Sequence, residues 1–208
     1  MNIEQLIKEK CPNGVEYKKI WDICILSQWC QVPVEEQYTE YEEWMVPFLR
    51  IIDFTQNTEP RYIKKVSEKY MKNEWDLIMI RYWAPWQVYF NKAGAIANNM
   101  FKMTFDNSLI VNKFAYYYLN MDEIQNKLLW AQWWALPSIK FEIVNKIEIP
   151  IPPIEIQNEI VNILDKFTEL EAELEARKSQ YEYYRDKLLT FGNSAERERD
   201  YRDWSGKN

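Results

Sequence analysis

The sequence predicts an α/β (α+β) domain with a mixed, largely antiparallel sheet, followed by one long coiled-coil helix. Short segments rich in β-branched and aromatic residues alternate with helical segments as far as residue 151. From Ile156 to Phe191, apolar or aromatic residues then recur with gaps that alternate between four and three. We therefore predict a head domain over residues 1–152, a helix over 153–191 and a loose polar tail over 192–208.

The head contains five segments that read as strands. Their β-branched and aromatic content places them at residues 46–54, 76–82, 87–90, 95–105 and 147–151. Helical stretches are predicted at 2–10 and from 112 through 129, with a short turn near 65–71. Tyr116, Tyr117 and Tyr118 fall in the second helical stretch, where we expect them to pack rather than to form a stacking surface.

The long helix carries an apolar seam that needs a partner. Pro153 suits the first position of a helix, and neither glycine nor proline interrupts residues 154–191. A lone helix of this length exposes its seam, so we expect a second helix to cover it. Arg177 either sets the register or orientation of that pairing or extends its guanidinium to water at a wet point of the seam. The predicted seam comprises Ile156, Ile160, Ile163, Phe167, Leu170, Leu174, Arg177, Tyr181, Tyr184 and Leu188.

Composition excludes several functions. The 208 residues include no histidine, so a histidine base or metal ligand is absent, and the four glycines lack the spacing of a phosphate-binding loop. The three cysteines match no zinc spacing, and we expect free thiols. No apolar run approaches a membrane span, and the N-terminus lacks the apolar core of a signal peptide, so we expect a cytoplasmic protein.

A basic segment stands out in a chain whose net charge is −6. Residues 61–92 carry seven lysines and arginines against three acidic residues. Such a local surplus of positive charge can meet nucleic acid although the total charge is negative, and a solvated basic face is the alternative. Asp53 and Asp76, with lysines nearby, could suggest a metal-dependent nuclease, but two carboxylates at such spacing are common in any soluble chain.

The sequence contains unusually many tryptophans, ten, and unusually few glycines, four. Trp83 and Trp86 flank Ala84-Pro85 between two predicted strands, where glycine would normally supply positive φ. We infer that many or all tryptophans stand where a functional ancestor carries glycine, for instance through a UGA codon read as tryptophan. The alternative is that the indoles are genuine and stack on bases or sugars.

Several segments resemble one known family. They are NGVEYKKIWDIC (13–24), VPFLRIIDF (46–54), the segment 75–105, and the segment 131–167 with the block IPIPPxxIQxEIVxILD (149–165). Together they are similar to the specificity subunit of type I restriction-modification enzymes. That family usually shows glycine where this chain has Trp21, Trp75, Trp83, Trp86 and Trp133.

The resemblance implies a single target recognition domain followed by a spacer helix, that is, half of a usual specificity subunit. Two copies would pair through antiparallel helices, and each head would read half of a split DNA site. The chain would perform no chemistry and bind no cofactor. Methyltransferase subunits docked on the helices would bring S-adenosylmethionine, and a motor-nuclease subunit can join. A coiled-coil assembly protein whose aromatic-rich head binds carbohydrate or protein remains the alternative.

Candidate DNA contacts are base-reading groups on loops and cations for phosphates. Arg81 and Tyr82 directly precede the WAPW loop and are the leading candidates. The further polar candidates are Arg50, Gln56, Asn57, Gln87, Gln132 and Ser138, and the phosphate candidates are Arg61, Lys64, Lys65, Lys69, Lys72, Lys92 and Lys140.

Overall fold

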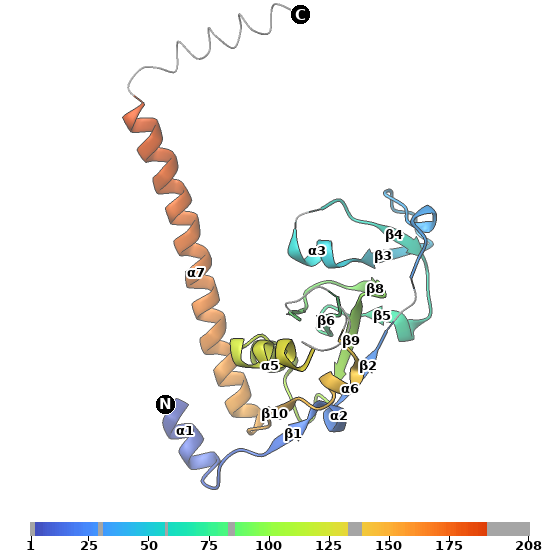
Figure 1. Ribbon diagram of the computed structural model, residues 1–208. Coiled ribbons are helices and arrows are strands. Elements are labelled where there is room, and N and C mark those ends of the chain that lie inside the picture. The colour runs from blue at the N-terminus through green and yellow to red at the C-terminus, as the bar shows by residue number, and fades with distance from the viewer. Residues whose placement is uncertain (1–2, 29–30, 57, 83–85, 133–138, 191–208) are drawn as a thin grey trace, which may run out of the picture. The chain divides into compact units, whose positions relative to one another are not determined.

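Three small sheets organise the head of the protein in a computed structural model that describes residues 3–28, 31–56, 58–82, 86–132 and 139–190 (Figure 1). The sheets have the strand orders β2-β9-β6-β7, β4-β3-β8-β5 and β1-β10. All pairings are antiparallel except β3 with β8. The strands are β1 (Tyr17–Lys19), β2 (Cys24–Ser27), β3 (Met45–Leu49), β4 (Tyr62–Lys64), β5 (Met71–Lys72), β6 (Leu77–Ile80), β7 (Val88–Tyr89), β8 (Gly94–Ile96), β9 (Met100–Phe105) and β10 (Glu148–Pro150).

Helices join and cover these sheets. The α-helices are α1 (Ile3–Lys10), α2 (Ile20–Ile23), α3 (Ile51–Thr55), α4 (Asn112–Leu119), α5 (Asp122–Gln132), α6 (Phe141–Val144) and α7 (Ile154–Leu189), and two short 3-10 helices are η1 (Val34–Glu36) and η2 (Glu68–Tyr70). By internal contacts the chain divides into two compact units, residues 1–161 and 162–208. The first turns of α7 therefore belong to the head, and the remainder of α7 belongs to the second unit.

Two hydrophobic clusters hold the head together. The larger cluster packs β2, β6, β7 and β9 against α4, α5 and α6, and includes Phe101, Leu119 and Val161. The smaller cluster packs β3, β4 and β8 with Ile78 and Met100 of the first sheet. Because Ile78 and Met100 stand in the β2-β9-β6-β7 sheet, the two sheets share one buried region.

Gly94 allows β8 to pass close to β3. Its φ is +151°, and a Cβ atom built there would lie 2.5 Å from the carbonyl oxygen of Pro47. A side chain at this position would collide with backbone, so this position requires glycine.

Gln157 fixes the start of α7 in the head. This side chain is 0% exposed. Its Oε1 accepts the N–H of Val111 at 2.8 Å, and its Nε2 donates to the carbonyls of Leu109 at 2.9 Å and Pro152 at 2.8 Å. A buried amide with three hydrogen bonds specifies one position for the helix start, because any shift would leave polar groups unpaired. Ile156 and Val161 are buried beside it.

The structure confirms most of the elements predicted from sequence. Strands form within 76–82, 87–90 and 147–151, a helix forms within 2–10, a 3-10 turn forms within 65–71, and a long helix runs to Leu189. The stretch predicted as helical from 112 through 129 is two helices, α4 and α5, and α5 continues to Gln132. Tyr116, Tyr117 and Tyr118 pack partly buried against the larger cluster, as expected. The predicted tail, residues 192–208, lies outside the described residues.

Two predicted strands are wrong in extent. Segment 46–54 is a strand only to Leu49, because Asp53 accepts the backbone N–H of Arg50 at 2.7 Å and caps the helix α3 that follows. Segment 95–105 is two strands in different sheets, because a turn at Ala97–Asn99 closes with a hydrogen bond from Met100 N to Ala97 O. Asparagines favour turns, and the apolar residues on both sides concealed this one.

The described tryptophans do not occupy left-handed backbone. Among described residues other than glycine, Asn91 has positive φ at 69°, whereas Trp21, Trp44, Trp75 and Trp130 do not. The expectation of positive φ at turn sites is therefore wrong at Trp44 and Trp75. Trp21, Trp75 and Trp130 are largely exposed, whereas Trp86 is 2% exposed in the larger cluster. Trp29, Trp83, Trp133, Trp134 and Trp204 lie outside the described residues.

The cysteine and membrane predictions can be compared with the described ranges. Cys11 and Cys24 are free thiols, as expected, and burial raises the pKa of Cys24 to about 12. Among the helices of the described ranges, none combines the length and apolar character that a membrane crossing needs.

We predict that Gln157→Met destabilises the head by about 2–4 kcal/mol, since each buried group left without its hydrogen-bond partner costs about 1–3 kcal/mol. Asn158→Met is the control, because Asn158 is the exposed neighbour on the same helix. Urea denaturation measures both variants. Equal stability of Gln157→Met and Asn158→Met would contradict the role assigned to Gln157.

Candidate nucleic-acid interface

One end of the β2-β9-β6-β7 sheet gathers the polar segments between strands. Ser27 at the end of β2 is paired with Lys102, and Ile80 at the end of β6 is paired with Met100 at the start of β9. The chain therefore leaves β2 and β6, and enters β9, at the same end of the sheet. The turn Ala97–Asn99 connects this end to β8 of the second sheet.

Hydrogen bonds join these segments to one another. Arg81 N donates to Asn99 O at 2.8 Å, and Ile139 N donates to Arg81 O at 3.0 Å. Gln28 Nε2 donates to Asn98 O at 2.6 Å. We call the described residues Gln28, Arg81, Tyr82, Gln87, Asn98 and Asn99 the loop end. Four stretches distant in sequence thus meet around Arg81.

The second sheet brings further polar residues to the same end. Leu49 of β3 pairs with Ile96 of β8, so Arg50 and α3 follow β3 at the end where β8 turns. Arg61 lies beside Phe48, because the N–H of Phe48 donates to the carbonyl oxygen of Arg61 at 2.7 Å. Lys69 precedes β5, which pairs antiparallel with β8, Met71 with Ala95 and Lys72 with Gly94. The residues before Met71 therefore lie toward the end of β8. Arg61 and Lys69 therefore lie toward the loop end.

Arg81 has unused hydrogen-bonding capacity. Its Nε and the Oδ1 of Asn99 are buried and lack a partner among the described residues. The guanidinium carbon lies 5.1 Å from the ring centre of Tyr82 and 5.5 Å from that of Phe101. These rings orient the guanidinium without consuming its donors. An Arg held in this way can form the bidentate contact that guanine offers.

A hollow of about 470 Å³ lies beside this segment, lined by several amides. Two of the amides are used internally. Asn120 exchanges hydrogen bonds with the backbone of Val88, and Gln125 donates to the carbonyls of Trp86 and Leu119. Gln87 and Asn126 are exposed on the same hollow. Amide side chains of this kind can pair with the edge of adenine.

Arg50 is a structural residue, which corrects its prediction as a DNA contact. Its Nε and Nη2 bind both carboxylate oxygens of Asp53 at 2.9 and 2.7 Å, and Nη2 also donates to Glu59 O at 2.9 Å. The hydrogen bonds with Asp53 raise the pKa of Arg50. Burial alone would raise the pKa of Asp53, but hydrogen bonds from Arg50 and Thr58 hold it below its ordinary value.

Lys72 is also structural, and its prediction as a phosphate contact is wrong. The side chain is 1% exposed. Its Nζ donates to the carbonyls of Asn73, Glu74 and Lys92 at 2.8, 3.2 and 2.7 Å. Burial lowers its pKa to about 8, against the attraction of Asp76 and Glu74. An ammonium group enclosed by three carbonyls cannot reach a phosphate.

The remaining predicted residues are distributed over the head. Lys64 and Lys65 are exposed near Met45 and Trp44, at the start of β3 and so opposite to the loop end. Lys92 donates its Nζ to Asp53 O, and Lys140 is exposed at the start of α6. Gln56 is exposed after α3, and the backbone of Gln132 ends α5. Asn57 and Ser138 lie outside the described residues.

Sequence reasoning missed Gln28, Asn98, Asn99 and Asn126 at this interface. The Asn-Asn pair could have indicated a turn between two strands. Gln28 and Asn126 gave no local signal, because their position depends on pairings between distant strands and helices.

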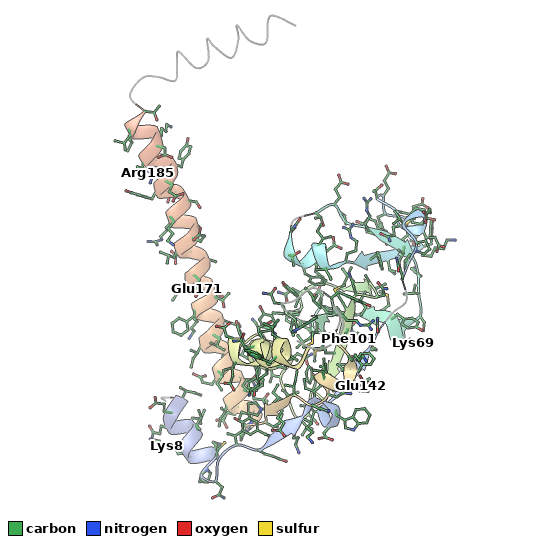
Figure 2. All side chains as sticks on the ribbon, in the orientation of Figure 1. Lys8, Lys69, Phe101, Glu142, Glu171 and Arg185 are labelled. Carbon is green, nitrogen blue, oxygen red and sulfur yellow. The ribbon has the colours of Figure 1, made fainter. Side chains whose placement is uncertain are left out.

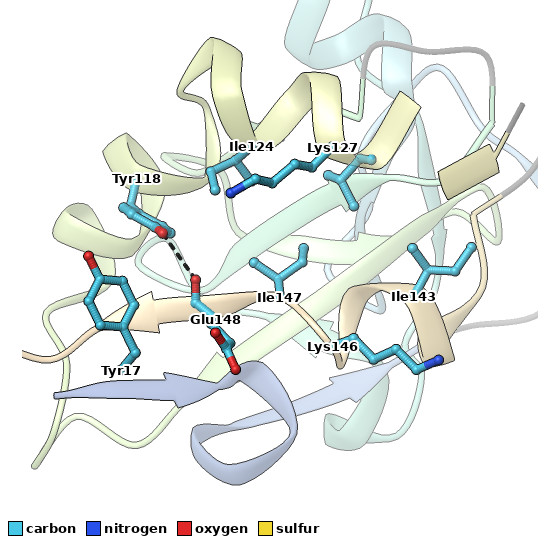
Figure 3. Close-up of a pocket in the computed structure, with 9 residues that line it drawn as sticks. Tyr17, Tyr118, Ile124, Lys127, Ile143, Lys146, Ile147 and Glu148 are labelled. Atoms are coloured by element: carbon cyan, nitrogen blue, oxygen red, sulfur yellow. Dashed lines mark hydrogen bonds between the residues drawn. The ribbon is translucent and has the colours of Figure 1, made fainter. Parts of the chain in front are cut away.

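A second hollow of about 500 Å³ lies apart from the loop end (Figure 3). Its floor is aliphatic, with Ile124, Leu128 and Ile147, and its rim carries Lys127 and Lys146. The hydroxyl of Tyr118 donates to Glu148 O at 3.0 Å. No loop-end residue lines it. Within the described residues, no group of three or more acidic or cysteine side chains could hold a metal ion.

The fold and the loop end define a recognition domain: a head that presents polar and cationic side chains between strands, continuous with a long helix. Comparison with known proteins gives the family. Residues 12–181 match the model of the type I restriction modification DNA specificity domain, so this chain belongs to that family. This match decides between the two classes that the sequence left open, in favour of the DNA specificity domain.

Individual relatives agree with the family match. The chain is 42% identical over 117 residues to the EcoR124I/EcoR124II specificity subunit of Escherichia coli. The matched segment covers 51% of this chain and 28% of that subunit. It is 37% identical over 105 residues to a putative type I restriction enzyme specificity subunit of Haemophilus influenzae. That matched segment covers 45% of this chain and 26% of the relative.

Solved structures show the same fold. A chain from a study of complex assembly in a type I restriction-modification system matches with a TM-score of 0.68 and 18% identity, covering 89% of this chain and 48% of that one. The HsdS subunit from Thermoanaerobacter tengcongensis matches with a TM-score of 0.61 and 19% identity, covering 84% and 44%. This chain thus spans about half the length of these structures.

We predict that burial of Lys72 makes stability depend on pH. Its pKa is about 8 in the folded chain and about 10.4 in an unfolded one, so the unfolded state binds more protons between these values. The free energy of unfolding of the parent should therefore rise from pH 8 to pH 10, relative to Lys72→Met, by at most about 1.4 kcal/mol per pH unit. Denaturant titrations measure it, with exposed Lys64→Met as control. A constant difference would contradict the burial of a charged Lys72.

We predict that Asp53→Asn costs about 1–3 kcal/mol at pH 7, because it removes the charge-assisted hydrogen bonds with Arg50. The lowered pKa of Asp53 means that its stabilisation is present above the unfolded value near 3.9 and is lost as the pH falls through the folded value. The difference from the parent should therefore shrink between pH 5 and pH 3. Glu59→Gln, an exposed acid in the same segment, should show little difference at either pH.

Proposed function

We propose that this chain reads one half of a two-part site in duplex DNA as a recognition subunit of a type I restriction-modification complex. The observation that carries the proposal is the loop end, where the partly exposed side chains of Gln28, Arg81 and Asn99 come together from distant parts of the chain. Base edges in the major groove offer donors and acceptors that such side chains can bind. Membership of the DNA specificity family supports this assignment.

Within this proposal, two sets of side chains divide the work. Arg81, Gln87, Asn99 and Asn126 read base edges, with Tyr82 holding the Arg81 guanidinium. Arg61 and Lys69 neutralise phosphates, together with Lys92, Lys140 and Gln56 where the duplex reaches them. Phosphate contacts position a duplex, and base contacts give specificity. Lys64 and Lys65, at the opposite end of β3, contribute little.

The second unit supplies the partner surface in this proposal. Phe167, Leu170, Leu174 and Tyr184 are each at least half exposed on α7. A second copy of this chain covers this seam, and the dimer presents two heads to an inverted repeat. Methyltransferase subunits that carry S-adenosylmethionine dock on the helices, and a motor-nuclease subunit can join. The chain itself performs no chemistry and acts in the cytoplasm.

Selection from a library of random 40-base-pair duplexes tests the proposal on the purified full chain. We expect enrichment of one sequence and its inverted repeat at fixed spacing, and binding that weakens steeply with salt. A variant with glycine at all ten tryptophan positions is selected in parallel, because either form can be the functional one. Enrichment of a single unrepeated motif would retain DNA reading and reject the dimer. Failure of both forms to enrich any sequence, or binding without salt dependence, would reject the proposal.

We predict that variants at or toward the loop end weaken DNA binding, whereas variants near the start of β3 do not. On the selected duplex, Arg81→Ala should cost about 1–3 kcal/mol and relax preference at one base position. Arg61→Ala and Lys69→Ala should weaken binding to all sequences and reduce the salt slope by about one each. Lys64→Ala and Lys65→Ala are matched controls of equal charge. Fluorescence anisotropy at several salt concentrations measures all five, and equal losses at both ends of β3 would contradict the interface.

A further inference from the structure

An apolar stripe that no other described residue covers runs along the second unit. Figure 2 draws the side chains of this helix, with Glu171 and Arg185 labelled. Phe167, Leu170, Leu174, Tyr181, Tyr184 and Leu188 are 50–70% exposed. Ile156, by contrast, is 1% exposed, so the prediction that a free seam begins at this residue is wrong. Ile160 and Ile163 are half-buried. The stripe available to a partner therefore begins near Phe167.

Arg177 interrupts this stripe at a seam position. Its Nη2 donates to Glu173 Oε1 at 2.6 Å on the same helix, and both side chains are well exposed. In a parallel pair of identical helices, each seam residue meets its own copy. A parallel dimer would therefore set two Arg177 side chains against each other. An antiparallel dimer avoids this contact, because each seam residue then meets a different one.

Three antiparallel registers overlap most of the exposed stripe. In the first register, Leu174 lies level with Leu170 of the partner subunit. In the second, Arg177 lies level with Leu174 of the partner subunit. In the third, Arg177 lies level with Tyr181 of the partner subunit. Residues flanking the seam then decide between them, since opposite charges there favour a register and like charges disfavour it.

The first two registers bring like charges together. With Leu174 opposite Leu170 of the partner subunit, Glu171 and Glu173 each lie opposite their own copies. With Arg177 opposite Leu174 of the partner subunit, Glu171 gains Lys178 of the partner subunit, but Lys166 faces Lys187 of the partner subunit. Neither arrangement satisfies all its flanking charges.

The third register satisfies nearly all of them. With Arg177 opposite Tyr181 of the partner subunit, Glu173 lies opposite Lys187 of the partner subunit, and Glu171 lies opposite Arg185 of the partner subunit. Gln180 meets its own copy without charge. Lys178 against its own copy is the single repulsive contact, and each Lys178 has Glu175 at 3.8 Å on its own helix.

We propose that two copies of α7 pair antiparallel in this third register, with the two-fold axis level with Ser179. Leu170 then packs against Leu188 of the partner subunit, Leu174 packs against Tyr184 of the partner subunit, and Arg177 stacks on Tyr181 of the partner subunit. The pairing rests on the homodimer of the proposed function and specifies its register. Arg177 is the residue that sets orientation, because its charge meets an aromatic ring instead of a second cation. The overlap from Leu170 to Leu188 spans about 27 Å of helix.

Cysteine crosslinking of the full chain tests the register. α7 contains no native cysteine, so introduced thiols report on this helix alone when linked peptides are identified by mass spectrometry. Leu170→Cys with Leu188→Cys should give a covalent dimer with a short bifunctional thiol reagent, through residue 170 of one copy and residue 188 of the other. We expect at least tenfold more of this product than in either control.

The two controls correspond to two competing arrangements, and a dimer in which none of these variants crosslinks also overturns the proposed register. Leu170→Cys alone crosslinks in a parallel dimer, and Leu170→Cys with Tyr181→Cys crosslinks in the second antiparallel register. Crosslinking of either control in place of the first pair overturns the register while the homodimer stands. Sedimentation of the parent chain as a monomer, with no pair crosslinked, overturns the homodimer and the register together. The parent chain would also be a monomer without crosslinks if a methyltransferase subunit, and not a second copy, covers the stripe.

Charge reversal gives an independent measure. Lys187→Glu should weaken the dimer at least tenfold, because it places Glu173 opposite a second acid, and adding Glu173→Lys should restore it. In the parallel arrangement Glu173 instead lies opposite Lys178 of the partner subunit, so Lys187→Glu would leave the dimer unchanged. Dimer dissociation constants from sedimentation distinguish the two, and an unchanged Lys187→Glu dimer overturns the proposed register.

Discussion

The buried amide of Gln157 is the contact on which the arrangement of the head's closing segments depends. It joins the segment before α4, the segment before α7 and α7 itself through three hydrogen bonds, and the side chain is fully buried. Nearby, β10 pairs with β1, so residues from both ends of the head meet at one place. A glutamine in an apolar core is unfavourable unless every hydrogen bond is formed, and this is the reason it can specify a single position for the helix start.

The cations of the head divide into two classes that composition alone does not distinguish. Lys72 and Arg50 stabilise the fold, one by binding three carbonyls and the other by binding Asp53. Arg61, Lys69 and Arg81 lie at or toward the loop end. An acidic chain can present a cationic face in this way, because short-range contacts with a duplex depend on local charge and are screened from distant acids.

Elements with a strong local pattern are predictable from sequence, and elements that end inside an apolar run are not. Period and composition located α7, α4, β6 and β10, because each has a strong local pattern. They failed at residues 46–54 and 95–105, where Asp53 and the Asn98-Asn99 turn end a strand inside an apolar run. Arg81 was identified because it directly precedes a loop, whereas Gln28 and Asn126 reach the interface only through long-range pairing. The basic count of residues 61–92 included Lys72, whose burial no local pattern indicates.

By itself the sequence determined the class of fold, the long helix with its seam, and the family, since these depend on periodicity and on a motif of consecutive residues. The reason Arg177 disfavours a parallel pair is also present in the sequence, because it follows from seam position alone. Only the tertiary structure decided which polar residues share a surface. Strand pairing brings residues 28, 81, 99 and 139 together across large separations, burial removes Lys72 from that surface, and the ion pair with Asp53 engages Arg50. Both effects depend on contacts between distant segments, which local sequence does not encode.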